Sequence, residues 1–564
     1  MSKFEKNRKK LAWLFKMKGL VLWSQLMADK LGLFFIWSFL ANILLRKKTI
    51  QKQFGSRMIY RQYSKVFKHA FSSEKKEKKS RQLLFFFAMG SESTYNARNF
   101  MLAYFFQNKG WNPEYLICDG VFDLCHKERL GKTRVDNRLF CQACIYGYDY
   151  VQRKSGIKME KMSSYANGSE VTIFEVGLKI EQDLKTIEDC QNFSFDHLQI
   201  GELVKVSVLR YFYSGVLKPE YLHVYKQYLK EGVRCALLFN DYLNTHSKEM
   251  IIFWNGAGFM DRVAMEVCRK RSIPFITQES FFGNSSWIYA KNKVAIHLDY
   301  SSEYKRDKKN FSFDEAENRD LEILIRGFSG NHDFSKKTDV KQLLGMDGKH
   351  QFVVLFTNMN FDTYVLGRDQ LFNNMFQWIE HTCNFWNALS KGVKLVVRAH
   401  PGELKYLTPS SDFVRNVMTS LISDNVLFVD ADSAISSYDL LDQSNGVLVY
   451  SSTIGVEAML LNKIVISSGT TFYQEFGLHP KSKAEYEFLL RNLIDGELSA
   501  NVDLNSLKHY LYYLYFKRVV QLRGFGINRL TGEDFIDETL NANELMKLNE
   551  EALNDFYNEM IYED

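Results

Sequence analysis

Two series of short apolar β runs, each run followed by a turn and a helical stretch, constrain the fold of this chain most. The first series begins with QLLFFF (82–87) and continues through EYLICDG, MIIFWNG and PFITQES. The second begins with QFVVLF (351–356) and continues through KLVVRAHP, NVLFVDAD, NGVLVYSST and KIVISSG. Buried strands that alternate with helices are typical of parallel α/β sheets. The sequence therefore predicts an α/β fold with two Rossmann-like domains facing across a cleft.

The length of 564 residues agrees with more than one domain, because one hydrophobic core rarely serves so long a chain. The expected organisation has four parts. These are a basic, membrane-proximal helical segment and linker over 1–80, an N-terminal Rossmann-like domain over 81–345, a C-terminal Rossmann-like domain over 346–490 and a helical tail over 491–564.

Positive charge is concentrated at the amino terminus. Residues 1–80 contain 20 Lys or Arg and 4 Asp or Glu, whereas the rest of the chain contains 53 and 62. Apolar runs interleave with these charges, among them LGLFFIWSFLANILL (31–45), which is shorter than the roughly 20 residues of a spanning helix. We expect residues 1–80 to form amphipathic helices on an anionic membrane surface, with burial or true spanning of 31–45 as alternatives. Nucleic acid is not expected as a partner.

The amino terminus does not resemble a cleavable signal peptide, because Lys16 and Lys18 interrupt its first apolar stretch. Eight cysteines in 564 residues do not make a disulfide scaffold. Together these features favour a cytoplasmic protein that is peripheral at the inner face of the plasma membrane.

Four of the cysteines lie within 27 residues, and one pair has C-x-x-C spacing; they are Cys118, Cys125, Cys141 and Cys144. Four thiolates can form a closed tetrahedral zinc site. A structural zinc site is therefore one interpretation of this cluster, and reduced structural cysteines are the other.

Polar residues follow the strands of the second series, where open parallel sheets bind their ligands. They fall in four clusters: Thr357–Asn358 with Asp362, Arg398–Glu403, Ser436–Tyr438 and Tyr450–Glu457. In the fourth cluster, hydroxyl residues and a glycine open a helix, so backbone N–H groups could hold a diphosphate while Glu457 accepts from ribose hydroxyls. A simple helix N-cap is the alternative. His400 could hold a phosphate or carry a proton.

Several of these segments also resemble a known family. FTNMNFD, VVRAHPGELK, ISSYDLL and VYSSTIGVEAMLLNKIVISSGTTFYQEFGL, in that order, resemble the carboxyl-terminal half of the capsule polysaccharide biosynthesis glycosyltransferases, a bacterial GT-B group. The likeness covers roughly residues 350–480, and NGAGFMDRVAMEVCRKRSIPFITQES (255–280) resembles the group's amino-domain motif. Ala257 departs from this pattern, since related sequences often have arginine there.

The resemblance implies that the C-terminal domain binds a nucleotide-sugar through His400, Glu403, Ser451, Ser452, Thr453 and Glu457. The other strand-end residues expected in this donor site are Thr357, Asn358, Arg398 and Ser437. A glycan or glycolipid acceptor would lie against the N-terminal domain near Asn255 and Gly256. Glu279 is the candidate general base, because an acceptor hydroxyl must lose a proton; a merely hydrogen-bonding carboxylate is the alternative.

The sequence also contains Asp430–Ala431–Asp432, which matches the D-x-D metal motif of another glycosyltransferase fold. In a GT-B layout, helix ends and side chains neutralise phosphates, so we interpret this pair as loop residues and expect no metal in catalysis. The predicted function is transfer of a sugar from a nucleotide donor to a capsular or lipopolysaccharide-type glycan. A polyol-phosphate transferase of teichoic-acid type and a non-catalytic GT-B scaffold are the alternatives.

Overall fold

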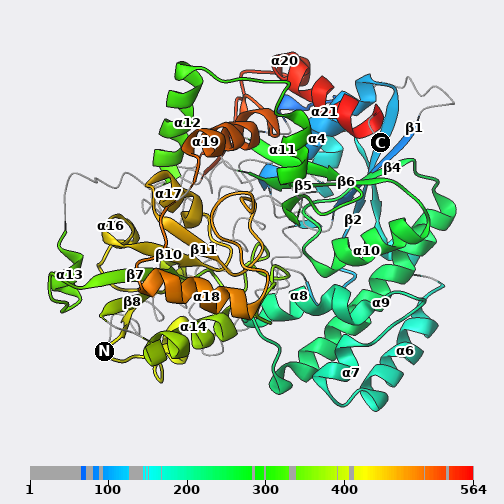
Figure 1. Ribbon diagram of the computed structural model, residues 1–564. Coiled ribbons are helices and arrows are strands. Elements are labelled where there is room, and N and C mark those ends of the chain that lie inside the picture. The colour runs from blue at the N-terminus through cyan, green and yellow to red at the C-terminus, as the bar shows by residue number, and fades with distance from the viewer. Residues whose placement is uncertain are drawn as a thin grey trace, which may run out of the picture. The chain divides into compact units, whose positions relative to one another are not determined.

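The architecture is taken from a computed structural model of the chain. It describes residues 62, 65–71, 81–87, 93–125, 144–145, 148–149, 151–166, 168–281, 286–297, 300–328, 338–389, 392–405, 412–500, 502–528 and 533–562. The described residues form two compact units (Figure 1). Unit 1 combines those up to Val208 with Lys218–Leu298 and Arg518–Asp564, and unit 2 combines Leu209–Leu217 with Asp299–Lys517.

Unit 1 is built on a seven-stranded sheet of order β12-β6-β5-β4-β1-β2-β3. Its parallel strands are β1 (Arg81–Phe87), β2 (Trp111–Ile117), β3 (Lys158–Lys161), β4 (Met250–Ile252) and β5 (Phe275–Ser280). Two antiparallel strands, β6 (Ser286–Lys291) and β12 (Val520–Gln521), extend the β5 edge. Strands β2 and β3 lie on one side of β1, and β4 and β5 lie on the other. The topological switch point is therefore between β1 and β4.

The helices that follow in unit 1 are α4 (Ser93–Asn108), α6 (Glu170–Asp183), α7 (Ile187–Gln191), α8 (Ile200–Phe212), α9 (Leu222–Thr245) and α10 (Phe259–Lys270). Of these, α6 and α7 pack against α9. In α9, the buried residues Tyr225, Leu229, Val233 and Ala236 recur every three or four positions, which places them on one face of the helix.

Unit 2 has an all-parallel five-stranded sheet of order β11-β10-β7-β8-β9. Its strands are β7 (Gln351–Phe356), β8 (Val393–Arg398), β9 (Val426–Val429), β10 (Gly446–Val449) and β11 (Ile464–Ser467). Among its helices are α11 (Tyr300–Asp307), α12 (Glu315–Phe328), α13 (Val340–Leu343), α14 (Met375–Leu389), α15 (Val414–Met418), α16 (Ser437–Gln443), α17 (Ile454–Leu460), α18 (Lys483–Ile494) and α19 (Leu504–Tyr512). This is the Rossmann strand order, with its switch point between β7 and β10. The predicted pair of α/β domains is confirmed.

The units divide the chain differently from the expected boundaries. Residues 299–345, which we assigned to the first domain, belong to unit 2. The expected helical tail is shared: α19 and the π-helical turn Tyr513–Lys517 belong to unit 2, whereas residues from Arg518 on belong to unit 1. Local sequence periodicity shows that a segment is helical, but it does not show which sheet the helix covers.

The carboxyl-terminal part of unit 1 comprises β12, the hairpin β13 (Phe525–Asn528) and β14 (Glu533–Ile536), and the helices α20 (Ala542–Leu548) and α21 (Glu550–Tyr562). Trp111 Nε1 donates to Tyr557 Oη at 3.0 Å, which joins α21 to the start of β2. Phe556 is 1% exposed and packs edge-on against Trp287 and Tyr289, which both lie in β6. This segment therefore completes the core of the first sheet.

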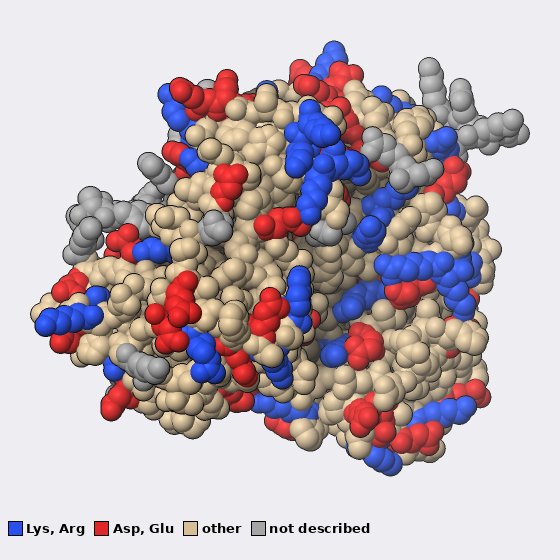
Figure 2. Space-filling view, viewed as in Figure 1, with Lys and Arg blue, Asp and Glu red and all other residues tan. Residues whose placement is uncertain are grey.

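Acidic and basic side chains lie interspersed over the face seen in Figure 2, as the nearly balanced composition of residues 81–564 predicts. Within the described ranges, no helix is long and apolar enough to cross a membrane. Apart from Gln62 and Lys65–Phe71, residues 1–80 lie outside those ranges. The membrane-surface role of that segment stays a prediction.

Candidate functional site

The switch point of the unit 2 sheet brings together two of the predicted clusters. Asn358, which follows β7, accepts a hydrogen bond at its Oδ1 from the backbone N–H of Ser451, which follows β10, at 3.3 Å. Asn358 is 8% exposed and Ser451 is fully buried. The sheet thus places both residues where Rossmann-like domains bind ligands.

A second contact joins the adjacent strand ends of β7 and β8. Thr357 Oγ1 accepts from the backbone N–H of His400 at 3.0 Å and donates to the carbonyl of Arg398 at 3.2 Å. The Nδ1 atom of the half-buried His400 ring lies 3.0 Å from the backbone N–H of Gly402, which donates to it. Because Nδ1 accepts this bond, a neutral His400 ring carries its proton on Nε2.

Arg398 ties β8 to the start of α16. Its Nε donates to Ser437 Oγ at 3.3 Å, and its Nη1 donates to the carbonyl of Asp430. The side chain is buried, and burial lowers the pKa of the guanidinium while Asp430 and Asp432 raise it. In the structure, Arg398 and Ser437 therefore organise the loops around the edge.

Glu457 of α17 and Tyr438 of α16 face each other beside the same edge. Burial raises the pKa of Glu457 to about 7, and a hydrogen bond from Tyr438 acts in the opposite direction. Both side chains are half-buried. The hydrogen bond links the first turns of two helices that follow β9 and β10, which lie on opposite sides of the β7–β8 pair in the sheet.

Glu403 lies in the short 3-10 helix Pro401–Lys405 and is 5% exposed. Its Oε1 accepts from the backbone N–H of Val414 at 3.4 Å, which holds the start of α15. Burial raises the pKa of Glu403 to about 8. Glu403 is thus an inward-facing acid that holds the start of α15, and its role in donor binding stays a prediction.

Tyr473 fixes the turn between β10 and α17. The carbonyl of Ser452 accepts from the backbone N–H of Gly455 at 3.2 Å and from Tyr473 Oη at 2.5 Å. A Cβ atom at Gly455 would lie 2.2 Å from Tyr473 Oη, so glycine is required there. Thr453 occupies the N-cap position of α17 without a side-chain capping bond, while Ser452 Oγ accepts from Ile454 N at 3.4 Å.

The D-x-D sequence lies in a loop where an arginine pairs with both carboxylates. Arg415 Nη2 lies 2.5 Å from Asp430 Oδ2 and 3.7 Å from Asp432 Oδ2. Asp430 Oδ1 also accepts from the backbone N–H of Ala431 at 2.7 Å. These contacts agree with the interpretation of the pair as loop residues; the expectation of metal-independent catalysis stays a prediction.

The carboxyl edge of the unit 1 sheet carries the other predicted cluster. Asn255 Nδ2 donates to Glu279 Oε2 at 2.9 Å, and the backbone N–H of Ser280 donates to Glu279 Oε1 at 2.7 Å. Asn255 Oδ1 accepts from the backbone N–H of Ala257 at 3.0 Å, which fixes the orientation of the amide. Gly256 adopts φ +70° and donates to the buried Asp261 at 3.2 Å. The Asn-Gly turn therefore orients the Glu279 carboxylate.

Residues of α4 that sequence reasoning missed lie at this same edge. Arg98 Nη2 donates to Ser280 Oγ at 3.3 Å, and its guanidinium lies 4.9 Å from the ring centroid of Trp287. Gln278 Nε2 donates to Asn99 Oδ1 at 2.6 Å. The available signal was the run Asn96-Ala97-Arg98-Asn99, which places polar residues in an otherwise apolar helical stretch.

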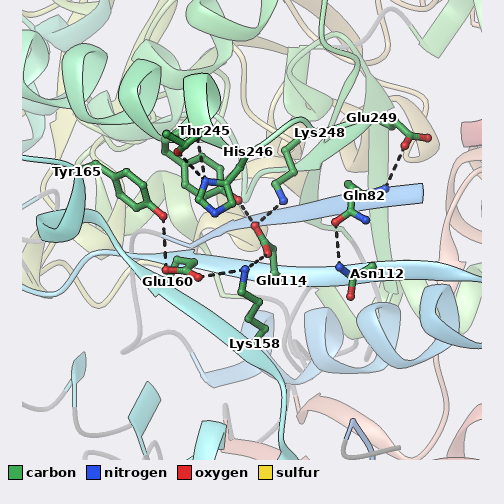
Figure 3. A network of polar contacts seen from close by, with 11 residues as sticks. Gln82, Asn112, Glu114, Lys158, Glu160, Tyr165, Thr245, His246, Lys248 and Glu249 are labelled. Carbon is green, nitrogen blue, oxygen red and sulfur yellow. Dashed lines mark hydrogen bonds and ion pairs between the residues drawn. The ribbon is translucent and has the colours of Figure 1, made fainter. Parts of the chain in front are cut away.

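A network of buried charge lies toward the opposite, amino ends of the strands in unit 1 (Figure 3). Glu114 of β2 lies 2.8 Å from Lys158 Nζ and 2.5 Å from Lys248 Nζ, and it accepts from Tyr242 Oη. Burial raises the pKa of Glu114, but these partners outweigh it and lower the pKa to about 2. Because ligands of such sheets bind at the carboxyl ends, we assign this network to stability.

The predicted zinc cluster is described only in part, since Cys141 lies outside the described residues. Cys118, Cys125 and Cys144 are each half-buried. Across the residues that the structure describes, no three His, Cys, Asp or Glu side chains gather as a metal site would require. The structural zinc therefore stays a prediction.

Comparison with known proteins supports the resemblance seen in the motifs. Residues 293–515 match the family model of the capsule polysaccharide biosynthesis proteins. The match takes in the whole unit 2 sheet and its site residues, and leaves out Asn255 and Glu279. No curated protein matches the chain.

Solved structures with similarity to this chain include two of Thermosulfurimonas dismutans KpsC. Its β-Kdo 2,7 transferase is 14% identical with a TM-score of 0.30, over 55% of this chain and 89% of that one. Its β-Kdo 2,4 transferase is 16% identical with a TM-score of 0.32, over 53% and 87%. The UDP complex of Staphylococcus aureus MnaA is 10% identical with a TM-score of 0.27, over 86% and 96%. The fold assignment itself comes from the strand orders described above.

Proposed function

We propose, from the match of residues 293–515 to the family model of the capsule polysaccharide biosynthesis proteins, that this chain is a glycosyltransferase of bacterial surface polysaccharide assembly. The donor is a nucleotide-activated sugar, and the acceptor is a capsular or lipopolysaccharide-type glycan. We further propose the GT-B type, with the donor bound by unit 2 and the acceptor by unit 1.

The observation that carries this proposal is the set of hydrogen bonds along the carboxyl edge of the unit 2 sheet. Ser451 N–H to Asn358 and His400 N–H to Thr357 connect three adjacent strand ends at the switch point. Hydroxyl groups, backbone N–H groups and a histidine N–H are suitable donors for a phosphate. Glu457, one turn into α17, is a suitable acceptor for ribose hydroxyls.

Glu279 is the proposed general base at the unit 1 edge. Each of its two oxygens accepts an N–H bond, one from Asn255 and one from Ser280, and these bonds fix the orientation of the carboxylate. In the reaction, Glu279 takes the proton of the acceptor hydroxyl while that oxygen bonds to the anomeric carbon of the donor. The bond from that carbon to the phosphate oxygen breaks, and the nucleotide leaves with the electron pair.

The proposed surroundings are the cytoplasm and the inner face of the plasma membrane. The support is the basic, apolar composition of residues 1–80, which suits an anionic membrane surface. Catalysis through helix ends and side chains needs no metal, so we expect nucleotide binding to be unchanged by EDTA.

Thermal unfolding in the presence of CMP, UDP, GDP, CDP, TDP or CDP-glycerol tests the donor site. A ligand at about 100 times its Kd adds roughly 2.7 kcal/mol to the free energy of unfolding, which is a visible shift in Tm. We expect one of these nucleotides to raise Tm, and His400→Ala and Glu457→Ala to abolish the shift. His381→Ala, a half-buried histidine 3.0 Å from Glu487, is the matched control and should keep it.

The outcomes separate the alternatives. A shift with CDP-glycerol alone would favour a polyol-phosphate transferase. No shift with any nucleotide, together with unchanged polymer production by His400→Ala cells, would favour the non-catalytic scaffold and overturn the proposal.

A further inference from the structure

The pairing of Tyr438 with Glu457 carries an inference that goes beyond these assignments and rests on the proposed donor site. Tyr438 lies at the second position of α16, and Glu457 at the fourth position of α17. These helices follow β9 and β10, which lie at opposite sides of the β7–β8 pair in the sheet. Their hydrogen bond therefore reaches across the edge at which the donor is proposed to bind.

The backbone around Tyr438 is held in place by its neighbours. Ser436 caps α16 by accepting from the backbone N–H of Tyr438 at 3.1 Å. Ser437 accepts from the buried Arg398 at 3.3 Å, which anchors the same turn to β8. The Tyr438 ring thus leaves a fixed helix start, and its hydroxyl reaches Glu457 from a defined direction.

The backbone around Glu457 is also held in place by its neighbours. The turn before it is fixed by Tyr473, whose hydroxyl donates to the carbonyl of Ser452 at 2.5 Å. The flanking α17 residues Val456 and Ala458 are buried, so the helix cannot rotate without loss of packing. The Tyr438 hydroxyl donates a hydrogen bond to the Glu457 carboxylate held in this way.

A carboxylate has two oxygens and about four acceptor positions. One hydrogen bond from Tyr438 uses one of these positions and restricts the rotamer of Glu457. A carboxylate can accept a further hydroxyl donor at the other positions. We propose that Tyr438 is a positioning residue that aims Glu457 at a ribose hydroxyl, so that this pair makes the donor site select ribonucleotides over deoxyribonucleotides. A hydrogen bond to a charged group is worth roughly 1.5–3 kcal/mol, or about ten- to a hundredfold in affinity.

Titration of the full-length protein with CMP and UDP, each beside its 2′-deoxy and 3′-deoxy analogues, tests this inference. For the wild type, we expect one deoxy analogue to bind about tenfold more weakly than the ribonucleotide. Tyr438→Phe should weaken ribonucleotide binding by about the same factor and leave the affinity of that deoxy analogue within about twofold. Glu457→Gln should show the same pattern, and the double variant should lose no more.

Tyr512→Phe is the matched control, because it removes a hydroxyl that donates to Glu317 in the same unit, between α19 and α12. It should leave all the affinities unchanged. If Tyr438→Phe weakens ribo- and deoxyribonucleotides equally, or weakens neither, the tyrosine has only a structural role and the inference is wrong. If Tyr438→Phe lowers Tm, Glu457→Gln is the deciding variant. An unchanged ratio of its ribonucleotide affinity to its deoxyribonucleotide affinity, compared with the wild type, would then contradict the inference.

Nucleotide binding by the wild type distinguishes a failure of the donor site from a failure of the role of Tyr438. If the wild type binds no ribonucleotide, the donor site falls and this inference falls with it. If the wild type binds ribonucleotides and their deoxy analogues equally well, the donor site stands and only the role of Tyr438 and Glu457 is overturned.

Discussion

Burial governs the protonation of several carboxyl groups beside the two sheet edges. It raises the pKa of Glu403 to about 8 and the pKa values of Glu457 and Asp261 to about 7. Near neutral pH these groups are therefore a mixture of neutral acid and carboxylate. Because a neutral acid can donate a hydrogen bond and a carboxylate cannot, the hydrogen bonding of both edges depends on pH.

Glu403→Gln should stabilise the protein above neutral pH. The pKa of Glu403 is about 8 in the folded state, above its ordinary value of 4.5. The protonated side chain therefore contributes its full stability below pH 4.5, and this contribution is lost as pH rises through 8. Glutamine stays neutral throughout. We expect the difference in Tm between Glu403→Gln and the wild type to increase by at least roughly 2–4 °C from pH 5 to pH 9. This corresponds to a change of about 1 kcal/mol in the difference between their free energies of unfolding.

Glu497→Gln is the control for this measurement, because Glu497 is exposed at the end of α18 in the same unit. Its Tm should follow that of the wild type across the range. A Glu403→Gln difference that stays constant from pH 5 to pH 9 would contradict a raised pKa at this position.

Single residues show how far the sequence could predict the site. Asn255 and Glu279 were both expected on the acceptor side of the N-terminal domain, and a 2.9 Å hydrogen bond joins them. Arg98 and Tyr473 were missed, since each acts through a partner distant in the chain. The sequence shows which polar residues end a strand, but not which distant side chain fixes them.

At the scale of elements, the turn between β10 and α17 depends on the contact of Gly455 with Tyr473. Tyr473 is fully buried, so it has little room to move away from an added methyl group. The same tyrosine holds the Ser452 carbonyl, and with it the N–H groups that open the helix. The packing of Tyr473 against Gly455 thus sets the positions of the backbone N–H groups at the start of α17.

Gly455→Ala should therefore destabilise unit 2 by about 1–3 kcal/mol, the usual cost of an overpacked core, and weaken nucleotide binding. Tyr473→Phe in the same chain should recover part of the loss, because it removes the atom nearest the new Cβ. Gly348→Ala is the control, since a Cβ there meets nothing within 4 Å. Equal melting temperatures of Gly455→Ala and Gly348→Ala would refute the proposed contact.

The strands of both sheets were predictable because buried parallel strands appear as continuous apolar runs. The long helix α9 and the antiparallel strands β6 and β12 were not predicted. β12 has only two residues, and it is a strand because Val520 pairs with Trp287 of β6. Such an element depends on a partner far away in the sequence, so no local pattern reveals it.

At the scale of the whole molecule, unit 1 draws its core from segments that lie far apart in the chain. Phe556 of α21 contacts Phe106 of α4 as well as Trp287 and Tyr289. The carboxyl-terminal helix α21 lies against the first sheet and is part of its core.

Phe556→Ala should destabilise unit 1 by about 3–5 kcal/mol, as for other large-to-small changes in a core. Hydrogen exchange of the native protein should become faster for the amides of β2 and α4, while those of β7 and β8 in unit 2 keep their protection. Tyr562→Ala on the same helix is the control, because Tyr562 is 68% exposed. Faster exchange in both units, or in neither, would count against this assignment.

The return of residues 518–562 to the first sheet has a consequence for synthesis on the ribosome. Domains commonly fold in the order in which they are made. Here unit 1 begins first, yet its core is closed only by residues made after all of unit 2. Unit 2 can therefore finish folding first, while Trp111 and Phe106 of unit 1 remain uncovered. A chaperone that shields this incomplete first sheet would act from the synthesis of β1 until α21 leaves the exit tunnel.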